Sequence, residues 1–385
     1  MELKAFLWSL IVIYITARVM GELAVRFGQS SVLGELLAGV LVGGSLLGWV
    51  EETETLKLLG EVGVMLLLFE VGLESDLQAF LKVGRSAVVV ATIGVVAPFV
   101  LGYGLAVAMH MTRLQAIFVG ATLTATSVAI SARVLFDLGK LKTQEGNIIL
   151  GAAVLDDILG LVTLSVIVGL AESGTVSWLE VSRTAGLAFL FLGVAIVVGI
   201  RYAHLFSRLV NQMKTRGRLI VAAVTFALLL GYLAELMHIA PIVGAFAAGL
   251  VLARTEHQSH IEETIKPVAD VFVPIFFVLV GVAVELSYFN PFNAENWPLL
   301  LLAGGLTLSA FIGKLVAGLG ALGEQVNHWA VGVGMLPRGE VGLIFAGVGL
   351  SHGIVEEGAY GAILVVVALT TLVSPILFKL LFKQG

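Results

Sequence analysis

The stretch GAAVLDDILGLVTLSVIVGL, residues 151–170, places two adjacent carboxylates, Asp156 and Asp157, in an otherwise apolar segment. A carboxylate inside membrane hydrocarbon costs several kcal/mol, so such residues line ion pathways or meet a charged partner. Neighbouring residues on an α-helix point about 100° apart. The two side chains therefore face different surroundings, and the stretch predicts a cation site for one and a basic partner for the other.

The composition of the 385-residue chain is that of a membrane protein, with 58% hydrophobic and 13% charged residues and a mean hydropathy of +1.04. A net charge of −5 at pH 7 argues against a nucleic-acid partner. The chain has no Cys, which excludes disulfides and thiolate metal sites. It also carries no phosphate-binding loop or metal-hydrolase motif, so we expect neither an enzyme nor a cofactor.

Thirteen apolar runs have the length of a membrane span and predict an all-α polytopic protein with about thirteen transmembrane helices. Four prolines, Pro98, Pro274, Pro337 and Pro375, fall inside runs and are expected to kink or break helices. The runs lie at roughly 4–25, 32–49, 57–74, 86–109, 114–137, 147–171, 180–203, 219–237, 240–254, 268–285, 298–321, 328–351 and 359–381.

The distribution of Lys and Arg predicts the orientation of these runs. With the N-terminus outside, fifteen basic residues fall at cytoplasmic ends and four at outside ends. This asymmetry orients membrane proteins, and the five Trp lie near run ends, as an interfacial belt requires. We therefore expect a multi-pass protein of the plasma (inner) membrane with its N-terminus outside and its C-terminus in the cytoplasm.

A weak internal repeat relates the two halves of the chain. The segment SVLGELLAGVLV resembles PIVGAFAAGLVL, and Gly39 matches Gly249 at an offset of 210 residues. Further on, Gly72 matches Gly281 at an offset of 209. The offset spans seven runs, an odd number, so the two copies are inverted in the membrane, as in many secondary transporters. Chance similarity between Gly- and Ala-rich helices is the alternative, and two matches at one offset disfavour it.

Two runs contain places where a helix is expected to open. The run at 114–137 contains Thr126 and Ser127, and one repeat later the run at 328–351 contains Pro337, Arg338 and Glu340. Proline and glycine favour irregular backbone, and hydroxyls satisfy the freed groups. Two such helices facing each other present the ends of their dipoles and free carbonyls to an ion. Arg338 and Glu340 would offset the charges at these dipole ends. Tight helix packing is the alternative for the Thr/Ser run.

Lys314 is the basic residue expected to meet the carboxylate doublet. At about 1.5 Å per residue, Asp156, Lys314, Pro337 and Thr126 all lie roughly 12–16 Å from the cytoplasmic ends of their helices. This shared depth predicts one site. Glu70 is an accessory candidate for a second titrating site, but its position near a cytoplasmic helix end favours a snorkelling or loop-bonded carboxylate.

The segments AAVLDDILGL, TATSVAISARVL, GMLPRGEVGLI and SVLGELLAGVLVG together resemble the cation:proton antiporter superfamily, of the monovalent cation:proton antiporter-2 type, and its NapA-like Na+/H+ branch. The resemblance runs over essentially the whole chain. It implies a homodimer in the lipid bilayer, each protomer being one transmembrane antiporter unit, residues 1–385. Its scaffold and dimerisation helices would be approximately 1–74 and 180–285, and its mobile transport bundle approximately 86–171 and 298–381, with two crossed discontinuous helices.

The resemblance also implies roles for individual residues. Asp157 matches the carboxylate that binds the proton and the ion in this family, and would therefore be a ligand of Na+. Asp156 matches the neighbouring carboxylate that pairs with a lysine, here Lys314. The residues that match the crossing of the discontinuous helices are Thr126, Ser127, Pro337, Arg338 and Glu340.

The function implied is electrogenic exchange of Na+ (or Li+) for H+, by competition at Asp157 and elevator-like alternating access, with no cofactor. K+/H+ exchange is the nearest alternative. Potassium-efflux relatives usually carry Gln before a single Asp, and the doublet here departs from that pattern, which favours Na+. An ion channel and a Na+-coupled solute symporter are the remaining alternatives.

Overall fold

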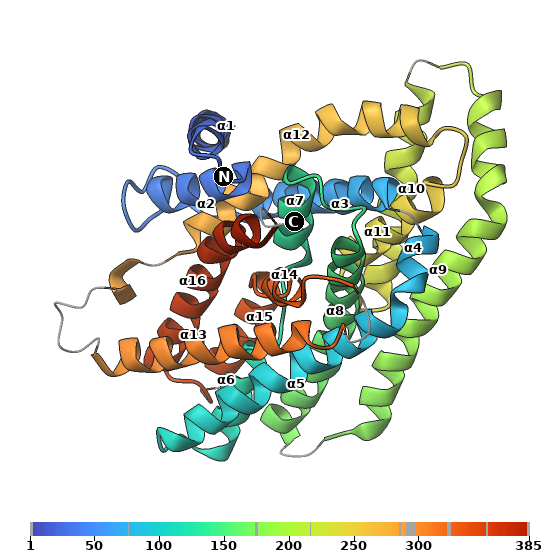
Figure 1. Ribbon diagram of the computed structural model, residues 1–385. Coiled ribbons are helices and arrows are strands. Elements are labelled where there is room, and N and C mark those ends of the chain that lie inside the picture. The colour runs from blue at the N-terminus through green and yellow to red at the C-terminus, as the bar shows by residue number, and fades with distance from the viewer. Residues whose placement is uncertain are drawn as a thin grey trace.

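A computed structural model describes residues 3–75, 77–173, 176–215, 217–284, 286–289, 297–321, 325–351 and 353–382. In these ranges the chain forms sixteen α-helices and one short 3₁₀ helix, η1 (Leu286–Phe289), and no strand. The helices pack around a central group formed by α8, α14 and α15 (Figure 1). The first half contains α1 (Leu3–Arg26), α2 (Ser31–Val42), α3 (Glu54–Glu74), α4 (Leu77–Lys82), α5 (Gly84–Ala108), α6 (Arg113–Thr122), α7 (Val128–Asp137) and α8 (Gln144–Ser173).

The second half repeats this order after one intervening long helix, α9 (Trp178–Gln212). Local sequence explains several of the helix starts. Asn327 caps α14 by accepting from the N–H groups of Trp329 and Ala330, and Thr112 and Gln115 form a reciprocal capping box at α6. The remaining helices are α10 (Arg218–Leu236), α11 (Pro241–Leu252), α12 (Gln258–Val282), α13 (Trp297–Gly318), α14 (His328–Gly334), α15 (Glu340–Ser351) and α16 (Glu357–Phe382).

Every predicted run overlaps a helix or a pair of helices, so the all-α membrane fold is confirmed. Within the described ranges, eight helices are long and apolar enough to cross a membrane: α1, α5, α8, α9, α10, α12, α13 and α16. The helices α2 and α11 are apolar but have only 12 residues each, and α3 carries five charged residues. The exact count of thirteen spans therefore stays a prediction.

Some boundaries differ from the predicted runs for a physical reason. Helix α12 begins at Gln258, ten residues before the predicted start, and α9 continues to Gln212. In both places the added stretch contains several polar or charged residues, QSHIEETIKP in α12 and HLFSRLVNQ in α9. Hydropathy marks the apolar length of a helix, whereas the hydrogen-bonded helix continues into the interface. The predicted run at 32–49 is longer than the helix that forms there, since α2 ends at Val42.

The inverted repeat is visible in mirrored close contacts of helices. A Cβ on Gly39 would lie 2.0 Å from the carbonyl oxygen of Val278 in α12, and one on Gly249 would lie 2.2 Å from that of Phe69 in α3. The second contact is the first one shifted by the repeat offset with the two halves exchanged. Only glycine allows backbones to approach this closely. Each half of the chain therefore packs against the other through equivalent positions.

The same relation holds between neighbouring helices within each half. A Cβ on Gly34 would meet the carbonyl oxygen of Met20 at 2.2 Å, so α2 lies directly on α1. At the offset of 210, a Cβ on Gly244 would meet the carbonyl oxygen of Leu230 at 2.2 Å, so α11 lies on α10 in the same way. Among the described helices α9 has no counterpart and separates the two halves, as the predicted inverted repeat requires.

The helices make two sets of extensive contacts. Helix α3 packs on α11 and α12, and α12 also packs on α2. Helix α5 packs on α13, α6 and α8, and α13 packs on α14 and α16. Helix α7 lies between these sets, contacting α2 and α3 as well as α8.

Candidate functional site

Two interrupted helices meet at the centre of the molecule. Helix α6 ends at Thr122 and α7 begins at Val128, while α14 ends at Gly334 and α15 begins at Glu340. The two unwound segments bond to each other, because the N–H of Ser127 donates to the carbonyl of Pro337 at 2.8 Å. A Cβ on Gly339 would lie 2.9 Å from Oγ of Ser127, so the segments touch. The predicted crossing of two discontinuous helices is therefore present.

Side-chain hydroxyls satisfy part of the backbone that the interruptions free. Oγ1 of Thr126 donates to the carbonyl of Met335 at 3.1 Å, and Oγ of Ser131 donates to that of Gly334 at 2.7 Å. Both carbonyls lie at the C-terminal end of α14, where helix carbonyls lack intrahelical partners. The Thr/Ser run therefore bonds across the crossing, which goes beyond tight helix packing.

Arg338 binds the open end of α6 from the opposite segment. Its Nη1 donates to the carbonyls of Leu123 and Ala125, the latter at 2.7 Å, and the whole residue is 0% exposed. These carbonyls lie at or just beyond the negative end of the α6 dipole, where a cation is stabilising. Arg338 thus offsets the dipole as the sequence predicts. Its own carbonyl accepts from Oγ1 of Thr371 in α16 at 2.6 Å.

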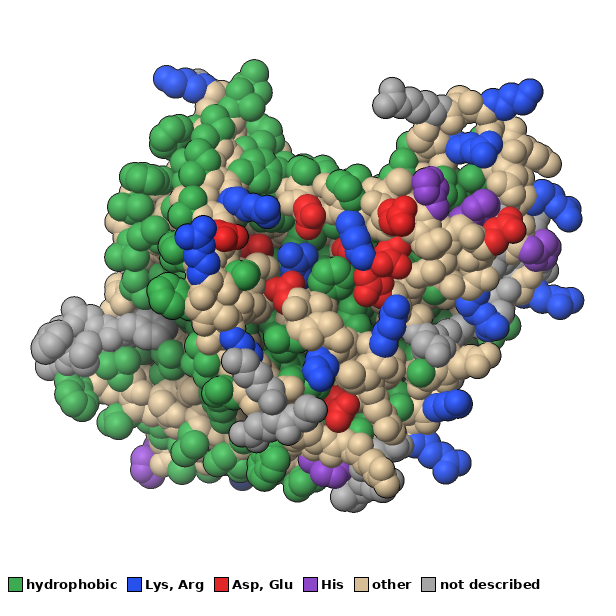
Figure 2. All heavy atoms as spheres, turned by 45° about the horizontal axis from the view of Figure 1, so that its top comes forward, with side chains coloured by type: hydrophobic (Ala, Val, Ile, Leu, Met, Phe, Trp, Pro, Cys, Tyr) green, Lys and Arg blue, Asp and Glu red, His purple; other side chains and the backbone are tan. Residues whose placement is uncertain are grey.

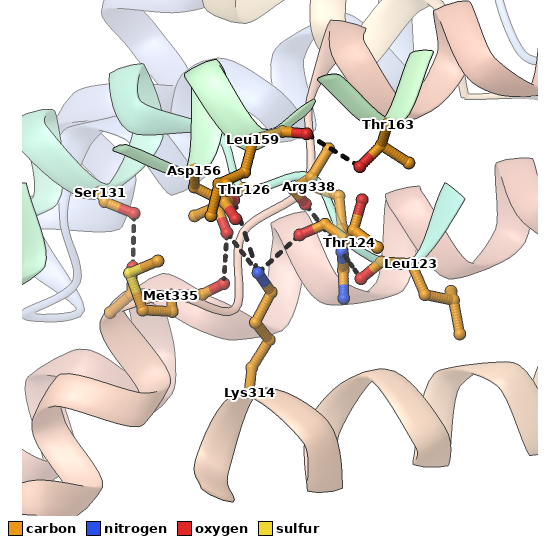
Figure 3. Close-up of polar contacts among 12 residues, drawn as sticks. Leu123, Thr124, Thr126, Ser131, Asp156, Leu159, Thr163, Lys314, Met335 and Arg338 are labelled. Atoms are coloured by element: carbon orange, nitrogen blue, oxygen red, sulfur yellow. Dashed lines mark hydrogen bonds and ion pairs between the residues drawn. The ribbon is translucent and has the colours of Figure 1, made fainter. Parts of the chain in front are cut away.

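Lys314 reaches the same crossing from α13. Its ammonium donates to the carbonyl of Thr124 at 2.6 Å and to Oγ1 of Thr126 at 2.7 Å. Its Nζ lies 3.5 Å from Oδ2 of Asp156, and the two side chains are 0% and 1% exposed. Figure 3 shows the lysine pointing into the space between the acid and the unwound segment. The predicted ion pair of Lys314 with Asp156 is thus present.

The carboxylate doublet divides between two surroundings, as neighbours on one helix must. Asp156 is 2% exposed and faces Lys314, while Asp157, the next residue of α8, is 7% exposed. The four residues expected at one depth are therefore joined: Lys314 bonds Asp156 and Thr126, and the segment that contains Thr126 bonds Pro337.

Glu340 and Glu70 are the predicted residues not named in the contacts above. Glu340 begins α15, but its side chain lies outside the described part of the structure. Glu70 is 2% exposed, so a snorkelling carboxylate is wrong at this position. The helix end near Glu70 is covered by other helices, and its charged neighbours include Arg133 and Lys266.

Sequence reasoning did not find Thr371 or the carbonyls that the two cations bind. Thr371 follows another buried threonine, Thr370, in the apolar helix α16. A hydroxyl pair in a span that also contains Pro375 was the available signal. The carbonyl contacts had none, because every residue has a carbonyl and only the folded backbone decides which ones lose their partners.

The chain matches the family model described as sodium/hydrogen exchanger, transmembrane, over residues 11–384. It is 40% identical to the high-affinity Na+/H+ antiporter NhaS3 of Synechocystis, over 99% of this chain and 90% of the relative. It is 37% identical to the Na+/H+-K+ antiporter GerN of Bacillus cereus, over 98% of this chain and 96% of the relative.

The fold is similar to that of the sodium proton antiporter MjNhaP1 from Methanocaldococcus jannaschii, with a TM-score of 0.69, 19% identity and coverage of 100% and 99% of the two chains. The family match extends over nearly the whole sequence, and the matched proteins are transporters and not enzymes. The chain is a multi-pass membrane protein, and it belongs to the sodium/hydrogen exchanger family.

Proposed function

We propose that this chain exchanges Na+ or Li+ for H+ across the membrane, with cation and proton competing for Asp157. The observation that carries the proposal is a buried carboxylate doublet at the crossing of two interrupted helices, with a buried lysine on its first member. Free carbonyls and carboxylates are the oxygen ligands that hard cations prefer. The names of the relatives NhaS3 and GerN support Na+ as the exchanged cation.

Lys314 acts in this proposal as a resident cation. Its ammonium binds oxygen atoms of Thr124, Thr126 and Asp156. The lysine thereby supplies a positive charge at the crossing while Na+ is absent. Arrival of Na+ at Asp157 places a second positive charge nearby and weakens the hold of Asp156 on the lysine. Exchange of two protons for one Na+ would carry net charge, which makes the transport electrogenic.

The proposed movement is that of one helix set against the other. The transport bundle, approximately 86–171 and 298–381, contains the crossing, and the scaffold, approximately 1–74 and 180–285, forms the contact with a second protomer in a homodimer. Sliding of the bundle against the scaffold exposes Asp157 to either side in turn. The protein lies in the plasma (inner) membrane with its N-terminus outside and its C-terminus in the cytoplasm.

The test is transport in proteoliposomes with a lumenal pH dye, an imposed pH gradient and NaCl, LiCl or KCl added separately. The wild-type chain should give a Na+-dependent pH change that responds to a potassium-valinomycin clamp, and Asp157→Asn should abolish it while the protein stays folded. Glu54→Gln, a change of an exposed carboxylate at the start of α3, is the matched control. Retained exchange in the Asp157→Asn variant would remove this residue from the mechanism.

K+/H+ exchange is the second candidate, because the name of the relative GerN, the Na+/H+-K+ antiporter of Bacillus cereus, includes K+. A response to K+ alone, insensitive to membrane potential, would establish it and would leave Lys314 as a structural residue. Cation flux without coupled proton movement in the same vesicles would instead indicate a channel.

A further inference from the structure

A groove of about 390 Å³ lies between the end of α9 and the first three turns of α10. Its walls are the facing sides of the two helices, because the lining positions recur at spacings of three, four and seven residues, as one face of a helix requires. The walls include Phe206, Val210 and Met213 at the end of α9, and Arg218, Ala222 and Leu229 on α10.

The groove is open to the outside of the helix bundle. Helix α10 packs extensively on α11 but only lightly on α9, so the two walls stay apart. The rings of Phe206 and Phe226 join the walls, with their centroids 6.0 Å apart. On the α10 wall, Val221 and Leu229 are exposed. Since α10 is a membrane span, an apolar groove on this surface faces lipid.

The end of α9 has one apolar side and one polar side at this groove. Phe206 and Val210 line the groove, whereas Arg208 and Gln212, each two residues further and thus about 200° around the helix, are exposed. A helix segment of this kind lies at the boundary between lipid tails and headgroups. The groove therefore begins where a phospholipid joins its headgroup to its tails.

The dimensions of the groove fit one acyl chain of one leaflet. The apolar span of α10 begins at Arg218, and Leu229 lies eleven residues further, about 16 Å along the helix. Half of a hydrocarbon core about 30 Å thick is about 15 Å. The volume divided by this length gives a mean cross-section of about 24 Å². A helix about 10 Å wide occupies about 80 Å², so a helix of a second copy is too wide for the groove.

A positive charge is fixed at the mouth of the groove. Nη1 of Arg218 donates to the carbonyls of Met213 and Asn211, the latter at 3.5 Å, and the side chain stays exposed. A guanidinium has five N–H donors in a planar fork that suits the oxygens of a phosphate. Lys214, between the two helices, is also exposed, and none of the described lining residues is acidic. Figure 2 shows further basic side chains along the side of the molecule that α9 forms.

We infer that this groove binds a phospholipid with an anionic headgroup. One acyl chain lies along the α10 wall, and the phosphate meets Arg218 and Lys214. Negative lipids of the cytoplasmic leaflet attract basic segments at the membrane surface. The assignment to that leaflet rests on the orientation given with the proposed function, whereas the binding itself does not depend on which ion is exchanged.

The test is native mass spectrometry of the full chain released from detergent, titrated with dioleoylphosphatidylglycerol or with dioleoylphosphatidylcholine. The wild-type chain should retain the anionic lipid in preference to the zwitterionic one. Arg218→Gln and Lys214→Gln should each weaken binding of phosphatidylglycerol about fivefold and leave phosphatidylcholine unchanged. Lys142→Gln, at an exposed lysine that does not line the groove, is the matched control and should bind both lipids as the wild type does.

Filling the groove tests the position of the acyl chain. Ala222→Phe places a ring inside the groove and should lower retention of both lipids, and Thr225→Trp does the same from an exposed lining position if the first variant does not fold. Leu228→Phe, at an exposed position of α10 outside the groove, should have no effect.

Three results would overturn the inference. The first is equal binding of the two lipids by the wild-type chain, and the second is unchanged lipid retention in both filling variants. The third is loss of dimers in the filling variants with lipid retention unchanged, which would show that a second copy of the chain covers the groove. Failure of the proposed function is read separately, from ion exchange in proteoliposomes.

Discussion

Replacing Lys314 by Gln tests whether the buried ion pair stabilises the crossing. The change removes the ammonium that lies 3.5 Å from Asp156 and donates to Thr124 and Thr126. Removing one partner of a buried pair costs about 3–5 kcal/mol, because the other charge is left uncompensated. Glutamine keeps an N–H donor, so we expect a loss near the lower end, about 3 kcal/mol. At roughly 2 °C per kcal/mol for a large chain, this corresponds to an apparent midpoint lower by roughly 6 °C.

The assay is thermal unfolding of purified protein in detergent at one heating rate, since membrane proteins of this size unfold irreversibly. The double variant Asp156→Asn/Lys314→Gln should recover part of the loss, because neither charge then remains alone. A coupling of about 2–3 kcal/mol is the expected size for such contacting groups. Lys57→Gln, at an exposed lysine on α3, is the matched control and should shift the midpoint by less than about 1 °C. Midpoint shifts that add without coupling would refute the view that the pair acts as a unit.

Three further predictions concern packing and hydrogen bonds. Gly39→Ala should lower the thermal midpoint strongly, because the added Cβ would lie 2.0 Å from a backbone oxygen of α12. Gly44→Ala is the control and should leave the midpoint unchanged, because no atom lies within 4 Å of its added Cβ. Equal midpoints in the two variants would contradict the close packing of α2 on α12. Ser131→Ala leaves the carbonyl of Gly334 without its hydroxyl donor and should cost about 1 kcal/mol in denaturant unfolding, with no loss expected if water takes its place. Thr371→Val removes the hydroxyl that donates to the carbonyl of Arg338 and should slow Na+-dependent exchange. Thr370→Val should slow it less, because the hydroxyl of Thr370 donates to carbonyls of its own helix. The measurement is the ratio of the transport rates of the two variants.

The sequence predicted the crossing because its signals are chemical. A proline inside a span and a run of hydroxyls mark places where the helix loses backbone hydrogen bonds. The rise of about 1.5 Å per helical residue was enough to predict that Lys314 and Asp156 lie at the same depth. The repeat was equally accessible, since close helix packing requires glycine and leaves it at fixed offsets. The helix interruptions, the helical rise and the glycine spacing all depend on the geometry of short segments, which the types of their own residues largely determine.

The buried position of Glu70 could not be predicted in the same way. A carboxylate near a helix end reaches water unless other helices cover it, and here α7 and α12 supply the charged groups around it. Helix ends were misplaced where charged residues continue a helix, as at the start of α12. Both failures concern contacts made by segments far apart in the chain, which hydropathy along one segment does not report.

The mirrored glycine contacts also constrain how the protein is made. Gly72 on α3 receives its partner Gly249 only after 177 more residues have been synthesised. At about 5–20 residues per second, this delay is roughly 10–35 s. During that interval the first half lies in the membrane with its packing surface unfilled, and its lasting structure is completed by the second half. A ribosome-bound chain stopped before α11 should therefore be cut by protease in α3 far faster than one stopped after α12.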